Sequence, residues 1–375
     1  MTGWQAAASL CYYSVFAATT YFRSSFGVSR TLIGVLAATA TLGYTLALLP
    51  SGAAVDGFGE RRVMLAALAG LAVAAGLVGV APTFALLLAA AFLLGVFYAP
   101  AMPASNRGIV AHAPPGRENS AMGLKQVGVT AGSGAASLVV AGVAAVAAWQ
   151  WGFAVIAAVA GGYSVVFAAT YRGTDAGGEW TLPDVGSLRG NRAYLLLVLA
   201  GLFVGATVFT TVGYALLYAD EAVGLSPALA GVVLAGVQTT GSAGRLLAGA
   251  LADRLGGGRG AAAVTAGQAG LAALLFGGLA LDPEAAVAVA LLLGVGVSIV
   301  GSTGVYYSCL AALVGSDEVG AATAGGQTAI NVGGLLVPPA FGYLADAAGY
   351  EAGWMLLAVC SLAALACILA VRAVG

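Results

Sequence analysis

The chain has 375 residues, of which 61% are hydrophobic and 8% charged, and its formal net charge is -1. This composition excludes a water-soluble protein, because its surface would lack the polar and charged groups that water requires. No Lys/Arg-rich run is present, which excludes nucleic acid as an expected partner. The expected surroundings of the chain are therefore a lipid bilayer.

Apolar runs long enough to cross a bilayer follow one another along the chain. A spanning helix needs about 20 largely apolar residues, and clusters of Gly, Pro, Asp and Arg separate such runs. The predicted helices are residues 4–22, 31–55, 62–81, 83–110, 119–145, 149–171, 193–219, 226–251, 261–281, 285–313, 319–344 and 352–373. The sequence thus predicts an all-α membrane protein with about twelve transmembrane helices.

The arginines predict the orientation, because basic residues are retained on the cytoplasmic side of a membrane. Most of them fall at helix ends on one predicted side, namely Arg61, Arg62, Arg117, Arg172, Arg189, Arg192, Arg254, Arg259 and Arg372. Only Arg23 and Arg30 fall at helix ends on the other side. Both termini are therefore expected in the cytoplasm, and the chain is expected to cross the cytoplasmic membrane many times.

The longest polar stretch, between Arg172 and Arg192, divides the chain nearly in half. We interpret residues 173–191 as a cytoplasmic linker. It would join an N-terminal bundle of six helices, residues 1–172, to a C-terminal bundle of six helices, residues 192–375.

A loop motif occurs once in each predicted half. The first copy contains Asp56-Gly57-Phe58-Gly59-Glu60-Arg61-Arg62, and the second contains Asp253-Arg254-Leu255-Gly256-Gly257-Gly258-Arg259. Both copies resemble the signature loop of the major facilitator superfamily, as do Pro114–Glu118 and Pro339–Gly349. The resemblance implies two pseudo-symmetric bundles that move a solute by alternating access, usually as a single chain.

The same resemblance assigns a gating role to six charged residues of this loop motif. They are Asp56, Arg61, Arg62, Asp253, Arg254 and Arg259. In the superfamily such residues stabilise the state closed to the cytoplasm through charge pairs that break on rocking. The first copy departs from the pattern, since Gly57 and Glu60 occupy positions that are frequently basic. The alternative is that these arginines only mark the cytoplasmic side.

Lys125 is the only lysine, and it lies about 10 Å inside its predicted helix, counted from Glu118. A charge within the bilayer costs at least ~2.5 kcal/mol, so such residues are candidates for function. Gln126 follows Lys125, and Gly128 and Gly132 are small enough to leave open space beside the ammonium group. The alternative is that Lys125 reaches the cytoplasm or pairs with a loop carboxylate.

Arg245 lies in the predicted helix 226–251, one turn beyond Gln238-Thr239-Thr240. The position of Arg245 in this helix resembles that of an arginine in facilitators of organic anions and monocarboxylates, such as oxalate/formate antiporters or cyanate transporters. The alternative is a brace to Asp253 or to another group at the cytoplasmic end of the helix. Arg107 lies nearer the membrane surface, and for it the brace is the favoured interpretation.

Neutral polar side chains form a second candidate set, because helices one, four, seven and ten line the central cavity in this superfamily. The set consists of Tyr12, Tyr13, Tyr98, Tyr214, Gln238, Tyr306, Tyr307, Gln327 and Asn331. Gln327 and Asn331 are four residues apart and share a helix face. The alternative for each tyrosine is an interhelical hydrogen bond or an interfacial aromatic belt.

The predicted helices hold no deeply placed carboxylate, so Lys125 and Arg245 give the expected cavity a positive charge. We therefore predict secondary transport of a small organic or inorganic anion, such as a monocarboxylate. The alternatives are efflux of hydrophobic or neutral compounds and, less favoured, a sensor built like a transporter. No catalytic constellation, metal-ligand set or cofactor motif occurs within the helices, so an enzyme is not expected.

Overall fold

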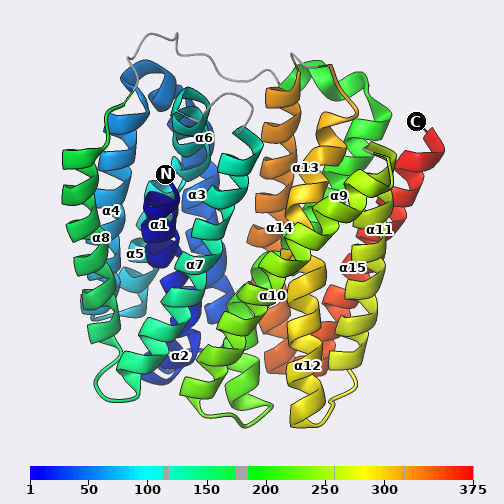
Figure 1. Cartoon of the computed structure of the whole chain (residues 1–375). Helices are drawn as coiled ribbons and strands as arrows, with labels where there is room; N and C mark the ends of the chain where they lie inside the picture. The colour runs from blue at the N-terminus through cyan, green and yellow to red at the C-terminus, as the bar shows by residue number, and fades with distance from the viewer. Residues whose placement is uncertain (113–117, 174–184, 257, 316–317, 375) are drawn as a thin grey trace. The chain divides into compact units, whose positions relative to one another are not determined.

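The computed structural model describes residues 1–112, 118–173, 185–256, 258–315 and 318–374, and every regular element in these ranges is a helix (Figure 1). In chain order the elements are α1 (Thr2–Ser14), η1 (Phe16–Ala18), α2 (Thr19–Phe26), α3 (Arg30–Phe58), α4 (Glu60–Val80), α5 (Phe84–Tyr98), α6 (Ala101–His112), α7 (Glu118–Ala144), α8 (Gln150–Thr170), η2 (Val185–Gly190), α9 (Arg192–Glu221), α10 (Pro227–Arg254), α11 (Gly258–Leu279), α12 (Ala285–Val295), η3 (Gly296–Val300), α13 (Thr303–Ala311), α14 (Val319–Ala348) and α15 (Tyr350–Val374). The predicted all-helical fold is confirmed.

Ten helical segments of the described ranges are long and apolar enough to cross a membrane. The predicted segments 4–22 and 226–251 are not among the ten. The turn η1 divides the first of them into short pieces, and the second falls on α10, whose apolar pattern is interrupted by Gln238 and Arg245. The multi-pass membrane protein is therefore supported, whereas the count of twelve and the side of the termini stay predictions.

Three predicted helices are interrupted in the structure. Residues 4–22 become α1, η1 and α2, and residues 285–313 become α12, the π-helical turn η3 and α13. Residues 83–110 become α5 and α6, which are separated at Ala99 and Pro100. Pro100 has no amide hydrogen to donate to the preceding turn, so it favours a break. Periodicity finds apolar runs but does not locate such breaks inside them.

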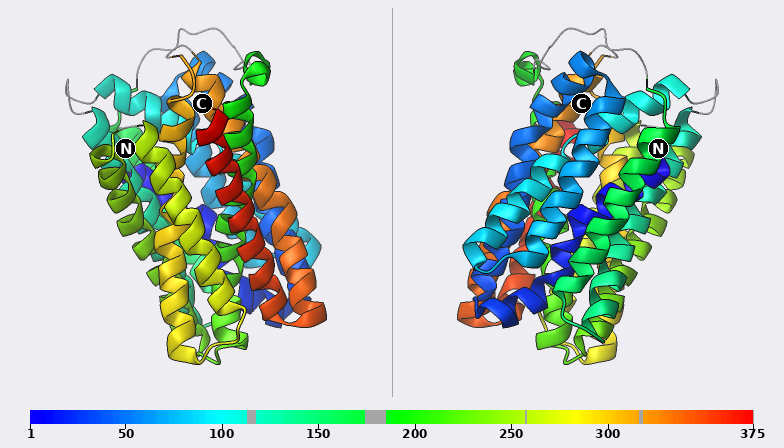
Figure 2. Two further views of the ribbon diagram at one scale, coloured as in Figure 1. Left: turned by 90° about the vertical axis from the view of Figure 1, so that its right-hand side faces the viewer. Right: turned by 90° about the vertical axis from the view of Figure 1, so that its left-hand side faces the viewer.

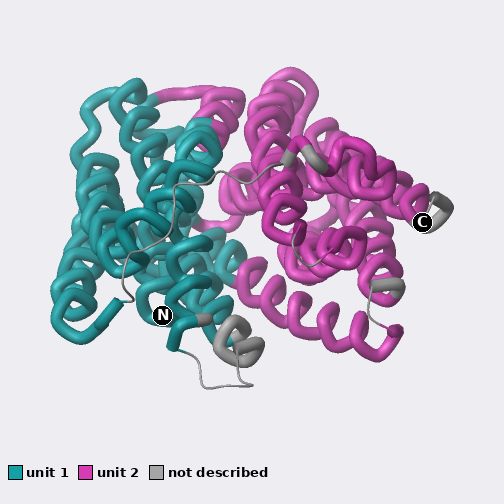
Figure 3. The backbone as a smooth tube through the Cα atoms, turned by 90° about the horizontal axis from the view of Figure 1, so that it is seen from above, with its two compact units in different colours: residues 1–26, 39–182, 227–235 teal, residues 27–38, 183–226, 236–375 magenta. Residues whose placement is uncertain are grey.

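The described chain divides into two compact units, coloured separately in Figure 3. Unit 1 comprises residues 1–26, 39–182 and 227–235, and unit 2 comprises residues 27–38, 183–226 and 236–375. The helices α3 and α10 therefore each contribute to both units. The predicted linker 173–191 lies largely outside the described residues, and the predicted domain boundary stays a prediction.

In unit 1, α1 packs along α7, and α4 packs against α5 and α8 (Figures 1 and 2). The contact between α1 and α7 depends on Gly128 and Gly132, because a Cβ atom there would overlap the carbonyl oxygens of Thr2 and Ala6. Small residues let helix backbones approach in this way. The expectation of open space beside Lys125 is therefore wrong at these glycines, since the α1 backbone fills it.

Replacing Gly132 with alanine is expected to destabilise the protein by about 1–3 kcal/mol, because backbone and not a flexible side chain occupies the space. Gly134 lies on the same helix with nothing within contact distance of a Cβ atom. Gly134→Ala is the matched control and should be neutral or slightly stabilising, because alanine favours helix formation. Thermal unfolding in detergent measures both; equal melting temperatures for the two variants would contradict the close packing of α1 on α7.

In unit 2, α9 packs along α14 and α15, and α11 packs along α15. The crossing of α9 and α14 again depends on glycine: a Cβ atom on Gly205 would overlap the Ile330 carbonyl, and one on Gly333 would overlap that of Leu202. Tyr194 and Tyr306 lie in the core next to this crossing. Within each unit, the helices are thus held together by close packing at small residues.

Candidate functional site

Lys125 on α7 is 1% exposed, so its ammonium group does not reach solvent. The Nζ atom donates to the Asn106 Oδ1 atom at 2.5 Å and lies 3.7 Å from the Met102 sulfur atom. Both acceptors belong to α6, so they orient the ammonium group and join α7 to α6. Gln126, the next residue, is half-buried, and its side chain makes no hydrogen bond with the described residues.

A line of polar side chains connects α1 with α5 and α6 in unit 1. The Ser105 hydroxyl donates to Gln5 Oε1 at 3.4 Å, and the Gln5 amide donates to Ser9 Oγ at 3.4 Å. The Ser9 and Tyr98 hydroxyls then lie 3.2 Å apart. Gln5, Ser9 and Ser105 are all buried, so hydrogen bonding within the line offsets the cost of removing them from water.

The tyrosines predicted in the first and fourth helices come together at the end of this line. The Tyr12 ring stacks on the Tyr98 ring with centroids 4.3 Å apart and planes within 5°. Tyr13 meets Tyr12 edge-on at 5.2 Å, and Tyr44 of α3 lies 5.8 Å from Tyr98. The four rings form a compact aromatic cluster in unit 1.

In unit 2, three predicted residues form a hydrogen-bonded chain. The Tyr307 hydroxyl donates to Gln327 Oε1, and Gln327 Nε2 donates to Asn331 Oδ1 at 2.8 Å. Asn331 is fully buried, and its Nδ2 atom has no hydrogen-bond partner among the described residues. The chain therefore ends on a buried donor that is ready for an acceptor.

Arg245 on α10 contacts the interrupted helix of unit 2. Its Nη2 atom donates to the Val300 carbonyl at 3.2 Å and to Thr303 Oγ1 at 3.1 Å. Arg245 is also close enough to Tyr307 to interact with it electrostatically. The predicted brace to Asp253 is absent from the described ion pairs, and the interruption at η3 instead supplies acceptors for the guanidinium group.

Three further candidates lie elsewhere. The Tyr306 hydroxyl, fully buried in the core, donates to the Leu197 carbonyl at 3.2 Å, which favours the interhelical alternative. The Tyr214 hydroxyl lies 2.6 Å from the Arg30 carbonyl oxygen. Gln238 is buried on α10, and its side chain makes no hydrogen bond with the described residues.

The first loop motif forms a charge cluster centred on Arg107. The Arg107 Nη1 atom lies 3.1 Å from Asp56 Oδ1, and its Nε atom lies 3.6 Å from Glu60 Oε2. Glu60 begins α4, and its side chain is 0% exposed. The resemblance predicts that Asp56 pairs with arginines of its own loop motif. In the structure, Arg107 of α6 contacts both Asp56 and Glu60.

Arg61 binds the end of α8. Its Nε atom donates to the Tyr171 carbonyl and its Nη2 atom to the Ala168 carbonyl, both at 2.7 Å. The last carbonyls of a helix have no partner within it, and a cation there also interacts favourably with the helix dipole. Arg61 thus holds α4 to α8.

Tyr171, just beyond α8, donates its hydroxyl to Glu60 Oε1 at 3.0 Å. Burial, together with this hydrogen bond and the negative charge of Glu60, raises the pKa of Tyr171 above its usual value. The hydroxyl therefore keeps its proton at physiological pH and stays a donor to Glu60.

The second loop motif shows no such cluster within the described residues. Asp253 and Arg254 are exposed and form no ion pair there. The side chain of Arg259 lies outside the described part of the chain, as do residues 114–117 of the proline-containing motif. The gating pairs predicted for the second half stay a prediction.

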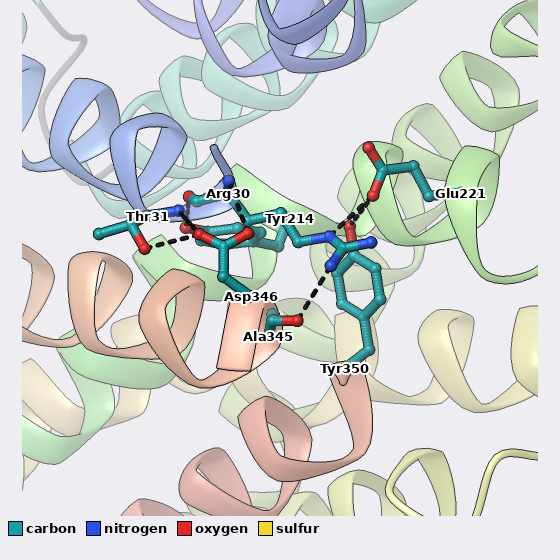
Figure 4. Close-up of polar contacts among 7 residues, drawn as sticks. All are labelled: Arg30, Thr31, Tyr214, Glu221, Ala345, Asp346 and Tyr350. Atoms are coloured by element: carbon teal, nitrogen blue, oxygen red, sulfur yellow. Dashed lines mark hydrogen bonds and ion pairs between the residues drawn. The ribbon is translucent and has the colours of Figure 1, made fainter. Parts of the chain in front are cut away.

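A second charge cluster surrounds the first residue of α3 (Figure 4). The Arg30 Nε atom lies 2.9 Å from Glu221 Oε2, and Nη1 donates to the Ala345 carbonyl at 3.0 Å. The guanidinium carbon lies 4.7 Å from the centre of the Tyr350 ring, whose hydroxyl also donates to Glu221. These contacts connect α3 with the ends of α9, α14 and α15, all within unit 2.

Asp346 caps the start of α3. Its carboxylate accepts from the Arg30 amide at 3.1 Å, from the Thr31 amide at 2.9 Å and from the Thr31 hydroxyl at 2.7 Å (Figure 4). A carboxylate at a helix N-terminus satisfies free amides and interacts with the helix dipole. Here a residue of α14 caps α3, which is possible because Gly342 lets the Arg30 carbonyl approach closely. We name Arg30, Thr31, Glu221, Asp346 and Tyr350 the α3 clasp.

Only indirect signals in the sequence point to the α3 clasp. Arg30 was an exception to the positive-inside pattern, and its pairing with Glu221 explains why a cation is tolerated at that end. Asp346 belongs to a motif that resembles the superfamily, but nothing in the motif names Thr31 as its partner. Within the described residues, no group of three His, Cys, Asp or Glu side chains could hold a metal ion.

Comparison with known proteins gives a family and a fold. The family model described as Major Facilitator Superfamily matches residues 4–309 and 198–374. No curated protein sequence matches the chain.

Several solved structures are similar over nearly the whole chain. A bacterial homolog of the human lysosomal transporter Spinster, in an inward-facing and occupied conformation, has a TM-score of 0.83 at 16% identity and covers 99% of this chain and 95% of its own. The nucleoside transporter NupG has a TM-score of 0.82 at 13% identity, covering 99% and 98%. A D-xylose–proton symporter has a TM-score of 0.76 at 16% identity, covering 98% and 96%. At 13–16% sequence identity, these similarities show a shared fold and nothing more.

Proposed function

The chain belongs to the major facilitator superfamily, and from this premise we propose that it is a secondary transporter of a small organic or inorganic anion, such as a monocarboxylate. It would act as a single chain in the cytoplasmic membrane, by alternating access. The membership supports transport as the activity, and the side chains of the two units support the substrate class.

The buried donor of Asn331 is the main support for this proposal. An unsatisfied buried donor costs about 1–3 kcal/mol, and an acceptor on a bound solute would recover that cost. Gln327 fixes the orientation of the Asn331 amide by donating to its oxygen atom, so the Nδ2 hydrogens remain for an acceptor. A carboxylate oxygen is an acceptor of this kind.

Charge supports an anion over a neutral acceptor. Each unit carries one of the two cations that the sequence predicts within the bilayer, Lys125 on α7 in unit 1 and Arg245 on α10 in unit 2. Keeping such charges in the bilayer is costly, and they are usually functional. The positive charge of both side chains would attract an anionic substrate.

A neutral substrate is the second candidate. The aromatic cluster of Tyr12, Tyr13, Tyr44 and Tyr98 offers flat apolar faces with hydroxyl groups at their edges, which suits a neutral or hydrophobic compound. Two of the similar structures are named for a nucleoside and for D-xylose. In this case Lys125 would serve to join α7 to α6.

Ligand-dependent thermal unfolding distinguishes the two substrate classes, because a ligand stabilises the folded state that binds it. The purified protein would be titrated with formate, acetate, lactate and oxalate, and in parallel with xylose, a nucleoside and a hydrophobic amine. An anion carrier should be stabilised only by members of the first group. Stabilisation by the second group alone would contradict the anion proposal.

Asn331→Leu tests whether the buried donor of Asn331 binds the substrate. Leucine is nearly isosteric and removes the unsatisfied donor, but it also removes the acceptor of Gln327 Nε2, so the stability of the variant without ligand should change little. The stabilisation by anions should disappear. Thr328→Val, on an exposed part of the same helix, is the matched control and should retain it. If Asn331→Leu retained full anion binding, this residue would have no part in the site.

A further inference from the structure

Three helices of unit 1 enclose an open groove with a volume of about 510 Å³. Its walls come from the second half of α3, the start of α4 and the end of α5, and they are largely apolar. Ser51 and Arg62 are the only polar side chains among the lining residues. The Ser51 hydroxyl donates to the Leu48 carbonyl of its own helix at 2.7 Å, so Arg62 provides the only charge in the groove.

The charge of Arg62 is not balanced by its described neighbours. Its side chain is exposed and makes no hydrogen bond or ion pair with the described residues. The two nearby carboxylates, Asp56 and Glu60, already bind Arg107, and Arg61 is engaged by the carbonyls at the end of α8. The charge cluster therefore leaves one cation for a partner from outside the protein.

The position of this cation relative to the groove indicates the partner's chemistry. Phe58, at the end of α3, is 55% exposed and lines the groove together with Arg62 at the start of α4. By the predicted topology this end lies at the cytoplasmic surface, where anionic lipids attract basic residues. A molecule with an anionic head and an apolar tail matches a cation beside an apolar groove.

A similar groove occurs in unit 2, which indicates that such grooves arise from the repeated fold. There α10, α11 and η3 enclose about 300 Å³. Leu255 lines it, at the position that corresponds to Phe58 in the repeated loop motif. The residue that corresponds to Arg62 is Arg259, whose side chain lies outside the described part of the chain, so we confine the inference to unit 1.

We propose that this groove binds one anionic phospholipid of the bilayer, with its phosphate on the Arg62 guanidinium and one acyl chain along the α3–α4–α5 groove. Planar guanidinium groups bind phosphate oxygens with two parallel hydrogen bonds. The acyl chain contributes apolar burial along the groove. Neither part needs Lys125 or Asn331, so this site is independent of the proposed substrate.

Native mass spectrometry of the detergent-purified protein tests the proposal with dioleoylphosphatidylglycerol and dioleoylphosphatidylcholine as probes. Wild type should retain one phosphatidylglycerol more tightly than phosphatidylcholine. Arg62→Gln should weaken phosphatidylglycerol retention about fivefold, the value of one basic residue near an anionic surface. Ala66→Trp should weaken retention of both lipids, because Ala66 lines the groove and is exposed in it.

Two control variants test whether a loss of lipid binding is specific to changes in the groove. Arg189→Gln removes an exposed arginine of η2, and Val73→Trp adds a large ring at a position of α4 that is 62% exposed. Both should retain lipid as wild type does. An inorganic phosphate arm separates a lipid from a free anion, and phosphate should not displace the lipid at equal concentration. Equal retention by wild type, Arg62→Gln and Ala66→Trp, or displacement by phosphate, would overturn the proposal.

Discussion

Replacing Arg107 with alanine is expected to lower the free energy of unfolding by about 3 kcal/mol. Glu60 is fully buried beside Arg107, and removing one partner of a buried pair leaves a carboxylate whose charge is poorly compensated. The value lies at the lower end of the usual range because Arg107 itself is 29% exposed. Thermal unfolding in detergent, with wild type alongside, measures the loss.

A second substitution identifies the cause of this loss. Glu60→Gln added to Arg107→Ala removes the buried negative charge while an amide can still accept a hydrogen bond from Tyr171. The double variant should recover most of the lost stability. A double variant no more stable than Arg107→Ala would show that Arg107 acts through packing or through Asp56 and not through Glu60.

Arg30→Ala is expected to open the α3 clasp. Arg30 contributes a half-buried ion pair, a carbonyl contact and a ring contact, which together are worth about 2 kcal/mol. Since α3 continues from unit 2 into unit 1 as one helix, losing the clasp frees the start of α3 from α9 and α14. This shifts a two-state equilibrium by about 30-fold.

Labelling of an introduced cysteine measures this opening. Ala37 on α3 is 2% exposed and lies beside Gly213 of α9, so Ala37→Cys should react slowly with a membrane-impermeant maleimide. Adding Arg30→Ala, or Glu221→Gln to remove the ion pair, should increase the rate, whereas adding Arg189→Ala should not. The native cysteines Cys11, Cys309 and Cys360 are buried and give little background, and the partly exposed Cys367 would be replaced by serine in all variants. An unchanged rate in the Arg30 variant would mean that the α3 clasp does not control access.

Much of the fold could be predicted because spanning helices leave a strong local pattern. Apolar runs of sufficient length and the repeated loop motif depend only on neighbouring residues. The family match confirms the superfamily predicted from that motif. The breaks at η1 and η3 were missed, because an apolar run looks the same whether its helix is continuous or interrupted.

The contacts of the candidate site were harder to predict because they join distant residues. Asp346 lies more than 300 positions from Arg30, and no pattern in either segment names the other. The sequence predicts a loop at Glu60 because charged residues usually end a helix, yet a partner on α6 and another beyond α8 allow its burial at the start of α4. Conversely, Gln327 and Asn331 were correctly paired, since residues four apart on a helix face one another.

Solute counterflow into proteoliposomes is the direct assay of anion transport by this protein. Vesicles loaded with an unlabelled carboxylate would be diluted into the labelled compound, with wild type compared against Lys125→Met, which removes the charge and keeps most of the side-chain volume. Wild type should accumulate labelled carboxylate transiently above its external concentration and take up no xylose. Lys125→Met should show no carboxylate accumulation. Uptake of neutral solutes by both proteins, with no carboxylate uptake by either, would contradict anion transport.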